Sequence, residues 1–202
     1  MFIIGITGGT GAGKTLALRA LESLGAYVLD SDAIYHDILA DDLKLISEID
    51  ERFPGVLRDG AVNRKLLGDI VFSDPSALLD LNAIAHKFIC IEIEARFKEW
   101  KAQGTAVAAI DAVALIESGI SKKCDVVIGV TAPVETRISR IIKRDHLTRE
   151  QAEMRINAQK PADFYIENCD HILDSTKDTP EQFEEKCKKF FTRLLGGHNN
   201  AG

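Results

Sequence analysis

The chain has 202 residues, of which 46% are hydrophobic and 28% charged, and its formal net charge is −6. This composition is typical of one globular domain, with room for an inserted subdomain. The negative balance argues against general binding to nucleic acid or to an anionic membrane surface. Four scattered cysteines without a C-x-x-C pair favour reduced thiols and a cytoplasmic location over a disulfide framework. No apolar stretch approaches the ~18 residues of a membrane span, so we expect no membrane association.

The first chemical motif is a glycine-rich loop, Gly8-Gly9-Thr10-Gly11-Ala12-Gly13-Lys14-Thr15. It follows an apolar run at 2–7 and precedes a helix-forming segment that begins at Leu16, the order that the phosphate-binding pattern G-x-x-x-x-G-K-[ST] requires. Glycines allow successive N–H groups to face one concavity, and the helix N-terminus adds its positive dipole end. We predict that residues 8–16 bind a nucleoside triphosphate.

Two side chains of this loop carry chemistry. Lys14 supplies a mobile charge for the β- and γ-phosphates, and the Thr15 hydroxyl is a candidate ligand for Mg²⁺. The loop by itself does not distinguish a kinase from a GTPase or an ATPase.

The remaining chain alternates short apolar runs with helical patterns, which predicts an α/β fold with about five parallel strands. Strands are expected at 2–7, 26–29, 107–110, 126–130 and 171–174. From residue 41 to about 100 only helical periodicity is found, which indicates a helical insertion beside the sheet. A C-terminal helix is predicted to end near Leu195, and 196–202 to form a disordered tail.

Arg137, Arg140 and Arg144 share one helix face because they are three and four residues apart. Phosphoryl transfer needs fixed positive charge near the γ-phosphoryl oxygens, so we predict that Arg140 and Arg144 contact the nucleotide; Arg137 is left open. One helix further along, Arg155 and Gln159 are candidates for a lid that closes over the nucleotide.

Two carboxylates compete for the role of general base. Asp32 follows the second strand at the edge where ligands bind in open α/β sheets, and it is the favoured candidate. Asp111 also ends a strand, where a Mg²⁺-linked aspartate is common in such folds. Asp30 is the more natural helix N-cap of the Asp30-Ser31-Asp32 segment.

Together these residues resemble the dephospho-coenzyme A kinase family over nearly the whole chain. The resemblance is carried by the loop at 8–15, by Leu29–Ala33, Asp59–Arg64, Phe72, Leu81–His86 and Leu115–Gly119, and by Arg140-x-x-x-Arg144-Asp145 followed by Arg155-Ile156-x-x-Gln159.

The resemblance implies a P-loop nucleotide kinase-like three-layer fold with a five-stranded parallel sheet. Its core would comprise 1–32 and 105–195, with a lid at about 140–165 and a helical substrate subdomain at 33–104. The implied reaction is ATP-dependent phosphorylation of the 3′-hydroxyl of dephospho-coenzyme A, the last step of coenzyme A biosynthesis, with Mg²⁺. From the negative net charge we expect no nucleic-acid partner, and we expect a monomer or a weak homo-oligomer.

Matching the family motifs also assigns roles to individual residues. Lys14, Asp32 and Arg140 would be catalytic, with Asp32 as the base, and the arginine of the lid would join Arg140 at the ATP phosphates. Arg64, His86 and Glu117 would line the substrate side together with Asp32.

The chain departs from the family pattern at three places. Val113–Glu117 reads Val-Ala-Leu-Ile-Glu where the family has Pro-Leu-Leu-Phe-Glu, Lys87 replaces a proline, and Ser175 replaces an asparagine near the adenine. These changes affect the expected backbone of the substrate pocket and the adenine site, not the transfer machinery.

Two alternatives were weighed against this reading. Another small-molecule kinase of the same fold would carry a different acceptor-binding signature. A GTP-binding switch would need Asp-x-x-Gly after a strand and [Asn/Thr]-Lys-x-Asp, and the chain has neither motif.

Overall fold

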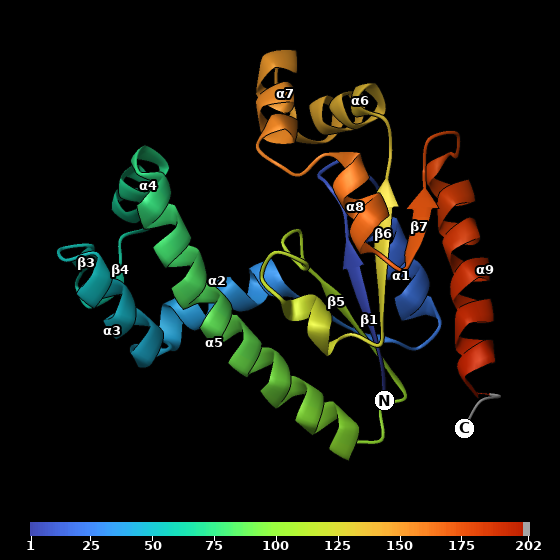
Figure 1. Cartoon of the computed structure of the whole chain (residues 1–202), viewed down its shortest axis with the longest axis horizontal. Helices are drawn as coiled ribbons and strands as arrows, with labels where there is room; N and C mark the ends of the chain where they lie inside the picture. The colour runs from blue at the N-terminus through green and yellow to red at the C-terminus, as the bar shows by residue number, and fades with distance from the viewer. Residues whose placement is uncertain (200–202) are drawn as a thin grey trace. The chain divides into compact units, whose positions relative to one another are not determined.

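The computed structural model describes residues 1–199 and divides into two compact units (Figure 1). One unit comprises Met1–Leu29 and Gly104–Gly202, and the other comprises Asp30–Gln103. The sequence-based boundaries were 32/33 and 104/105. Asp32 therefore belongs to the helical unit rather than to the core in which it was placed.

A five-stranded sheet forms the centre of the first unit, in the order β2-β5-β1-β6-β7. Its central strand β1 pairs in parallel with β5 and with β6, and β6 pairs in parallel with β7. The strands are β1 (Phe2–Thr7), β2 (Tyr27–Asp30), β5 (Val107–Asp111), β6 (Val126–Thr131) and β7 (His171–Asp174). The α/β fold with a five-stranded parallel sheet, predicted from the alternating pattern, is confirmed.

Helices cover this sheet, and α1 and α9 pack side by side on it (Figure 1). Their shared core contains Leu21 of α1, Phe183 and Phe191 of α9, and Ile4 and Ile6 of β1, all at most 1% exposed. The helices of this unit are α1 (Lys14–Ser23), α6 (Val134–Asp145), α7 (Arg149–Asn157), α8 (Ala162–Asn168) and α9 (Pro180–Asn199), with a 3₁₀ turn at Ile120–Lys123.

Two features of this unit differ from the sequence-based expectation. The short helix α8, which packs against β6 and β7, was not predicted. The helix α9 runs to Asn199, so residues 196–199 are helical and not part of a disordered tail. The rest of that predicted tail, 200–202, lies outside the described residues.

The predicted lid region contains the end of α6, all of α7 and most of α8. Helices α6 and α7 share a small apolar cluster of Ile138, Ile141, Ala152 and Ile156. A capping box begins α7, since the Thr148 hydroxyl accepts from the Gln151 amide and the Gln151 side chain accepts from the Thr148 amide.

The second unit is a group of helices around its own core, which includes Leu45, Ile49, Phe53 and Leu67. Its elements are α2 (Ser31–Asp41), α3 (Leu43–Arg52), β3 (Leu57–Arg58), β4 (Ala61–Val62), α4 (Arg64–Ser73) and α5 (Pro75–Ala102). The expectation of an all-helical insertion was wrong at β3 and β4, an antiparallel hairpin whose two-residue strands are too short to show a period of two. No helix within residues 1–199 has the length and apolar character needed to cross a membrane.

Candidate active site

The glycine-rich loop joins the buried end of β1 to the first turn of α1. Gly8, Gly11 and Gly13 have φ of 142°, 76° and 111°, values that favour glycine. A Cβ at Gly8 would also lie 2.2 Å from the carbonyl oxygen of Val130 on β6, so the loop approaches the neighbouring strand too closely for any side chain.

Several amide groups of this loop remain available for a ligand. Among the described residues, no backbone or side-chain acceptor takes the N–H groups of Gly11, Gly13, Lys14 or Thr15. They lie at the N-terminus of α1, where the helix dipole is positive. The arrangement can therefore bind an anion such as a phosphate chain.

Lys14 lies beside a carboxylate from the adjacent strand. Its Nζ is 3.6 Å from Oδ1 of Asp111, and the two side chains are 14% and 19% exposed. The parallel register that pairs Ile6 with Asp111 places this carboxylate at the loop end of the sheet. Asp111, the alternative to Asp32 as general base, thus lies beside the lysine of the glycine-rich loop.

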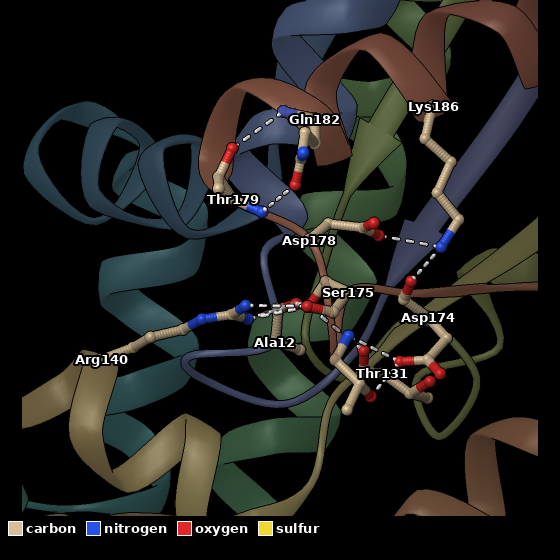
Figure 2. A network of polar contacts seen from close by, with 10 residues as sticks. Ala12, Thr131, Arg140, Asp174, Ser175, Asp178, Thr179, Gln182 and Lys186 are labelled. Carbon is tan, nitrogen blue, oxygen red and sulfur yellow. Dashed lines mark hydrogen bonds and ion pairs between the residues drawn. The ribbon is translucent and has the colours of Figure 1, made fainter.

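Arg140 reaches from α6 to the carbonyl side of the loop (Figure 2). Its Nη1 donates to the carbonyl oxygens of Gly11 and Ala12 at 3.2 and 3.4 Å and to Ser175 Oγ at 2.7 Å, and its Nη2 donates to the Ser175 carbonyl at 2.9 Å. Arg140 was predicted to contact the nucleotide; in the structure its guanidinium donates to the backbone of the loop and to Ser175.

Ser175 completes this contact from the segment after β7. The side chain is buried, and its hydroxyl donates to the Ala12 carbonyl at 2.7 Å while its amide donates to the Thr131 carbonyl at 3.0 Å. Ser175, where the resemblance predicted an asparagine, therefore ties the loop to the adjoining strand ends. This contact was not predicted from the sequence.

The segment that carries Ser175 is itself held at both ends (Figure 2). Lys186 of α9 donates to the Asp174 carbonyl at 2.6 Å and pairs with Asp178 at 2.9 Å. Thr179 and Gln182 form a capping box at the start of α9. The backbone on both sides of Ser175 is therefore held by hydrogen bonds.

Arg137 and Gln159 hold the loop at Thr10. The Arg137 Nε donates to the Thr10 carbonyl at 2.8 Å, and the Thr10 amide donates to Gln159 Oε1 at 2.8 Å. Gln159 was predicted as a lid residue; in the structure its side chain contacts the loop backbone. The motif Arg155-Ile156-x-x-Gln159 identified Gln159 as a candidate site residue, but it did not predict the contact with Thr10.

Arg144 and Arg155 converge on Asp145 at the end of α6. Arg144 donates to both carboxylate oxygens of Asp145, at 2.7 and 2.9 Å, and Arg155 Nη1 donates to Oδ2 at 2.7 Å. The hydrogen bonds from Arg144 lower the pKa of Asp145 and raise that of Arg144. Arg144 Nη2 also lies 3.5 Å from the Thr10 hydroxyl, so this cluster adjoins the phosphate loop.

Three predicted substrate residues lie on different helices of the second unit. Asp32 is exposed in the first turn of α2, Arg64 is the first residue of α4, and His86 lies on α5. Asp30, not Asp32, caps α2, because its carboxylate accepts from the amides of Asp32 and Ala33. Arg64 is close enough to Tyr35 of α2 to lower its pKa, against the larger effect of burial.

Glu117 lies in the first unit, in the segment after β5. Its charge and, more strongly, burial raise the pKa of Tyr165 on α8, while Arg137 lowers it. The first unit thus gathers the loop with Asp111, Arg137, Arg140, Arg144 and Glu117, whereas Asp32, Arg64 and His86 belong to the helical unit.

These observations define the class of the protein. A strand–loop–helix phosphate site on a parallel sheet in the order β2-β5-β1-β6-β7 is the architecture of a P-loop kinase. The fold resembles that of shikimate kinase from Acinetobacter baumannii, with a TM-score of 0.56 and 17% identity over 98% of this chain and 94% of that one.

The chain belongs to the dephospho-CoA kinase family, whose model matches residues 2–181. It is 36% identical to dephospho-CoA kinase from Geobacter sulfurreducens over 195 residues, 96% of this chain and 98% of that protein. It is also similar to the structure of dephospho-CoA kinase from Campylobacter jejuni, with a TM-score of 0.70 and 25% identity over 97% and 98% of the two chains.

The Arg144–Asp145–Arg155 cluster predicts a pH dependence. Because the pKa of Asp145 is lowered in the folded state, its ionised form contributes stability above the ordinary aspartate pKa, and this contribution is lost as pH falls through the lowered value. Carboxyl NMR titration should place the Asp145 pKa below the usual ~3.9. Urea midpoints should fall less steeply in acid for Asp145→Asn than for the unmodified chain; equal slopes would contradict the role of this cluster.

Proposed function

We propose that the chain transfers the γ-phosphoryl group of ATP to the 3′-hydroxyl of dephospho-CoA and releases ADP and CoA, the last step of CoA biosynthesis. The observation that carries the proposal is membership of the dephospho-CoA kinase family across residues 2–181. The open amide groups of the loop at the N-terminus of α1 provide the phosphate site that this reaction needs.

The phosphate chain of ATP is proposed to bind the loop, with Lys14 at the β- and γ-phosphates. Charge develops on the phosphoryl oxygens as the bond to the leaving group breaks, and a fixed cation stabilises it. Arg144 lies next to the Thr10 hydroxyl, and 59% of its side chain is exposed, so it is the arginine of α6 that we propose to contact these oxygens.

Asp32 is the proposed general base. Its carboxylate is exposed, and the capping role in α2 is taken by Asp30, so Asp32 is open to accept the proton of an attacking hydroxyl. Asp111 is the competitor; its carboxylate lies 3.6 Å from the ammonium group of Lys14, and the same Asp32→Asn variant distinguishes the two candidates.

The donor set at the loop suits Mg²⁺. The Thr15 hydroxyl in the first turn of α1 and the Asp111 carboxylate beside Lys14 are hard oxygen ligands, of the kind that hold Mg²⁺ together with substrate phosphates. When bound, Mg²⁺ would neutralise charge on the phosphate oxygens. We propose Thr15 as its protein ligand, with Asp111 as the nearby carboxylate.

The acceptor is proposed to contact the helical unit. Arg64 and His86 would bind the polar groups of dephospho-CoA, and Glu117 is a further proposed substrate residue. A cytoplasmic enzyme that acts as a monomer or a weak homo-oligomer fits the composition and the small-molecule substrates.

Asp32→Asn tests the base. We expect kcat to fall by roughly 10²–10⁴, because the variant cannot accept the proton, while ATP affinity stays unchanged. Asp30→Asn is the matched control, since asparagine caps a helix about as well as aspartate. Steady-state kinetics with a separate ATP titration measure both; near-normal kcat in Asp32→Asn would transfer the role to Asp111.

The choice of acceptor is tested by coupled ADP release across a panel of phosphoryl acceptors. The panel contains dephospho-CoA, shikimate, gluconate and a nucleoside monophosphate, which represent other small-molecule kinases. We expect release with dephospho-CoA alone. Release with a nucleoside monophosphate and none with dephospho-CoA would overturn the proposal.

A further inference from the structure

Arg137 and Gln159 form a closed set of hydrogen bonds with one loop residue. Arg137 Nε donates to the Thr10 carbonyl at 2.8 Å, and Arg137 Nη2 donates to Gln159 Oε1 at 3.1 Å. The same Gln159 oxygen accepts from the Thr10 amide at 2.8 Å. The backbone N–H and the carbonyl of Thr10 are therefore both held by side chains, from Gln159 and from Arg137.

The Arg137 guanidinium is in direct contact with the loop backbone. The residue is 5% exposed, and a Cβ placed on Gly9 would lie 2.2 Å from its Nη2 and 2.7 Å from its Cζ. Only a glycine at position 9 leaves room for this group. The charge of Arg137 thus lies against the backbone of the glycine-rich loop at Gly9 and Thr10.

This charge has no carboxylate partner among the residues that the structure describes. Its acceptors are a carbonyl and an amide oxygen, both neutral, whereas the neighbouring Arg144 and Arg155 pair with Asp145. Burial lowers the pKa of Arg137, yet an arginine stays protonated at neutral pH. The nearby Tyr165 phenol, whose pKa is raised, is neutral as well.

A buried charge without a counter-ion is costly unless a ligand supplies one. We propose that Arg137 is a positioning residue whose charge complements the phosphate chain of ATP, and that Gln159 must be a neutral amide because a carboxylate there would cancel this charge. The inference rests on the proposed binding of ATP by the loop. It assigns Gln159 a role in nucleotide affinity besides its contact with Thr10.

Gln159→Glu separates charge from hydrogen bonding, because a glutamate retains an oxygen that accepts from both Arg137 and Thr10. We expect the free variant to have a higher Tm than the unmodified chain, since Arg137 gains an ion pair. We also expect its ATP affinity to fall about tenfold. This is the effect of the repulsion between one added negative charge and one phosphate charge at roughly 10 Å, with an effective dielectric constant of about 20. The loss should be smaller for ADP and absent for adenosine.

Two further variants complete the experiment, with Kd measured by calorimetry and Tm by thermal unfolding. Gln159→Leu removes the acceptor without adding charge, so we expect a lower Tm and a smaller loss of ATP affinity than in Gln159→Glu. Gln151→Glu is the control: it makes the same substitution at an exposed capping position of α7, and we expect unchanged nucleotide affinities.

The outcomes distinguish the inference from the proposed function. Unchanged ATP affinity in Gln159→Glu, an equal loss in Gln159→Leu, or an equal loss for adenosine would each overturn the charge role of Arg137. If the unmodified chain bound adenosine as tightly as ATP, the proposed phosphate site itself would fail, whatever the variants showed.

Discussion

The phosphate site depends on which groups form hydrogen bonds with the backbone carbonyls of the glycine-rich loop. A phosphate chain is repelled by carbonyl oxygens and attracted by N–H groups, so a phosphate loop must turn its carbonyls toward other donors. Here Arg137 takes the Thr10 carbonyl, Arg140 those of Gly11 and Ala12, and Ser175 adds a second bond to Ala12. With these carbonyls fixed, the free N–H groups at the start of α1 are preorganised for an anion, which lowers the ordering cost of binding.

The strand order explains why these donors come from distant parts of the chain. Because β1 is central, β5 flanks it on one side and β6 on the other. Strand β5 ends at Asp111, beside Lys14. Strand β6 is followed by α6, which contains Arg137 and Arg140. Then β7, next to β6, ends directly before Ser175. One parallel sheet thus supplies the acidic and basic sides of the phosphate site.

Local signals in the sequence were enough to predict much of this framework. The loop, the strand runs and the cap at Asp30 are short-range patterns, and the structure contains all of them. The contacts that hold the loop join residues far apart, such as Thr10 and Gln159, 149 positions away, and spacing alone cannot reveal them. Helix α8 and the β3–β4 hairpin were missed because elements so short carry little periodicity.

The central claim is that the loop is already set for phosphate before the nucleotide arrives. Backbone amide NMR during an ATP titration tests it most directly. The account predicts large shifts for the amides of Gly11, Gly13, Lys14 and Thr15, and a small shift for Thr10, whose N–H stays bonded to Gln159. A Thr10 amide that leaves Gln159 and joins the phosphate, or loop amides that do not respond to ATP, would contradict it.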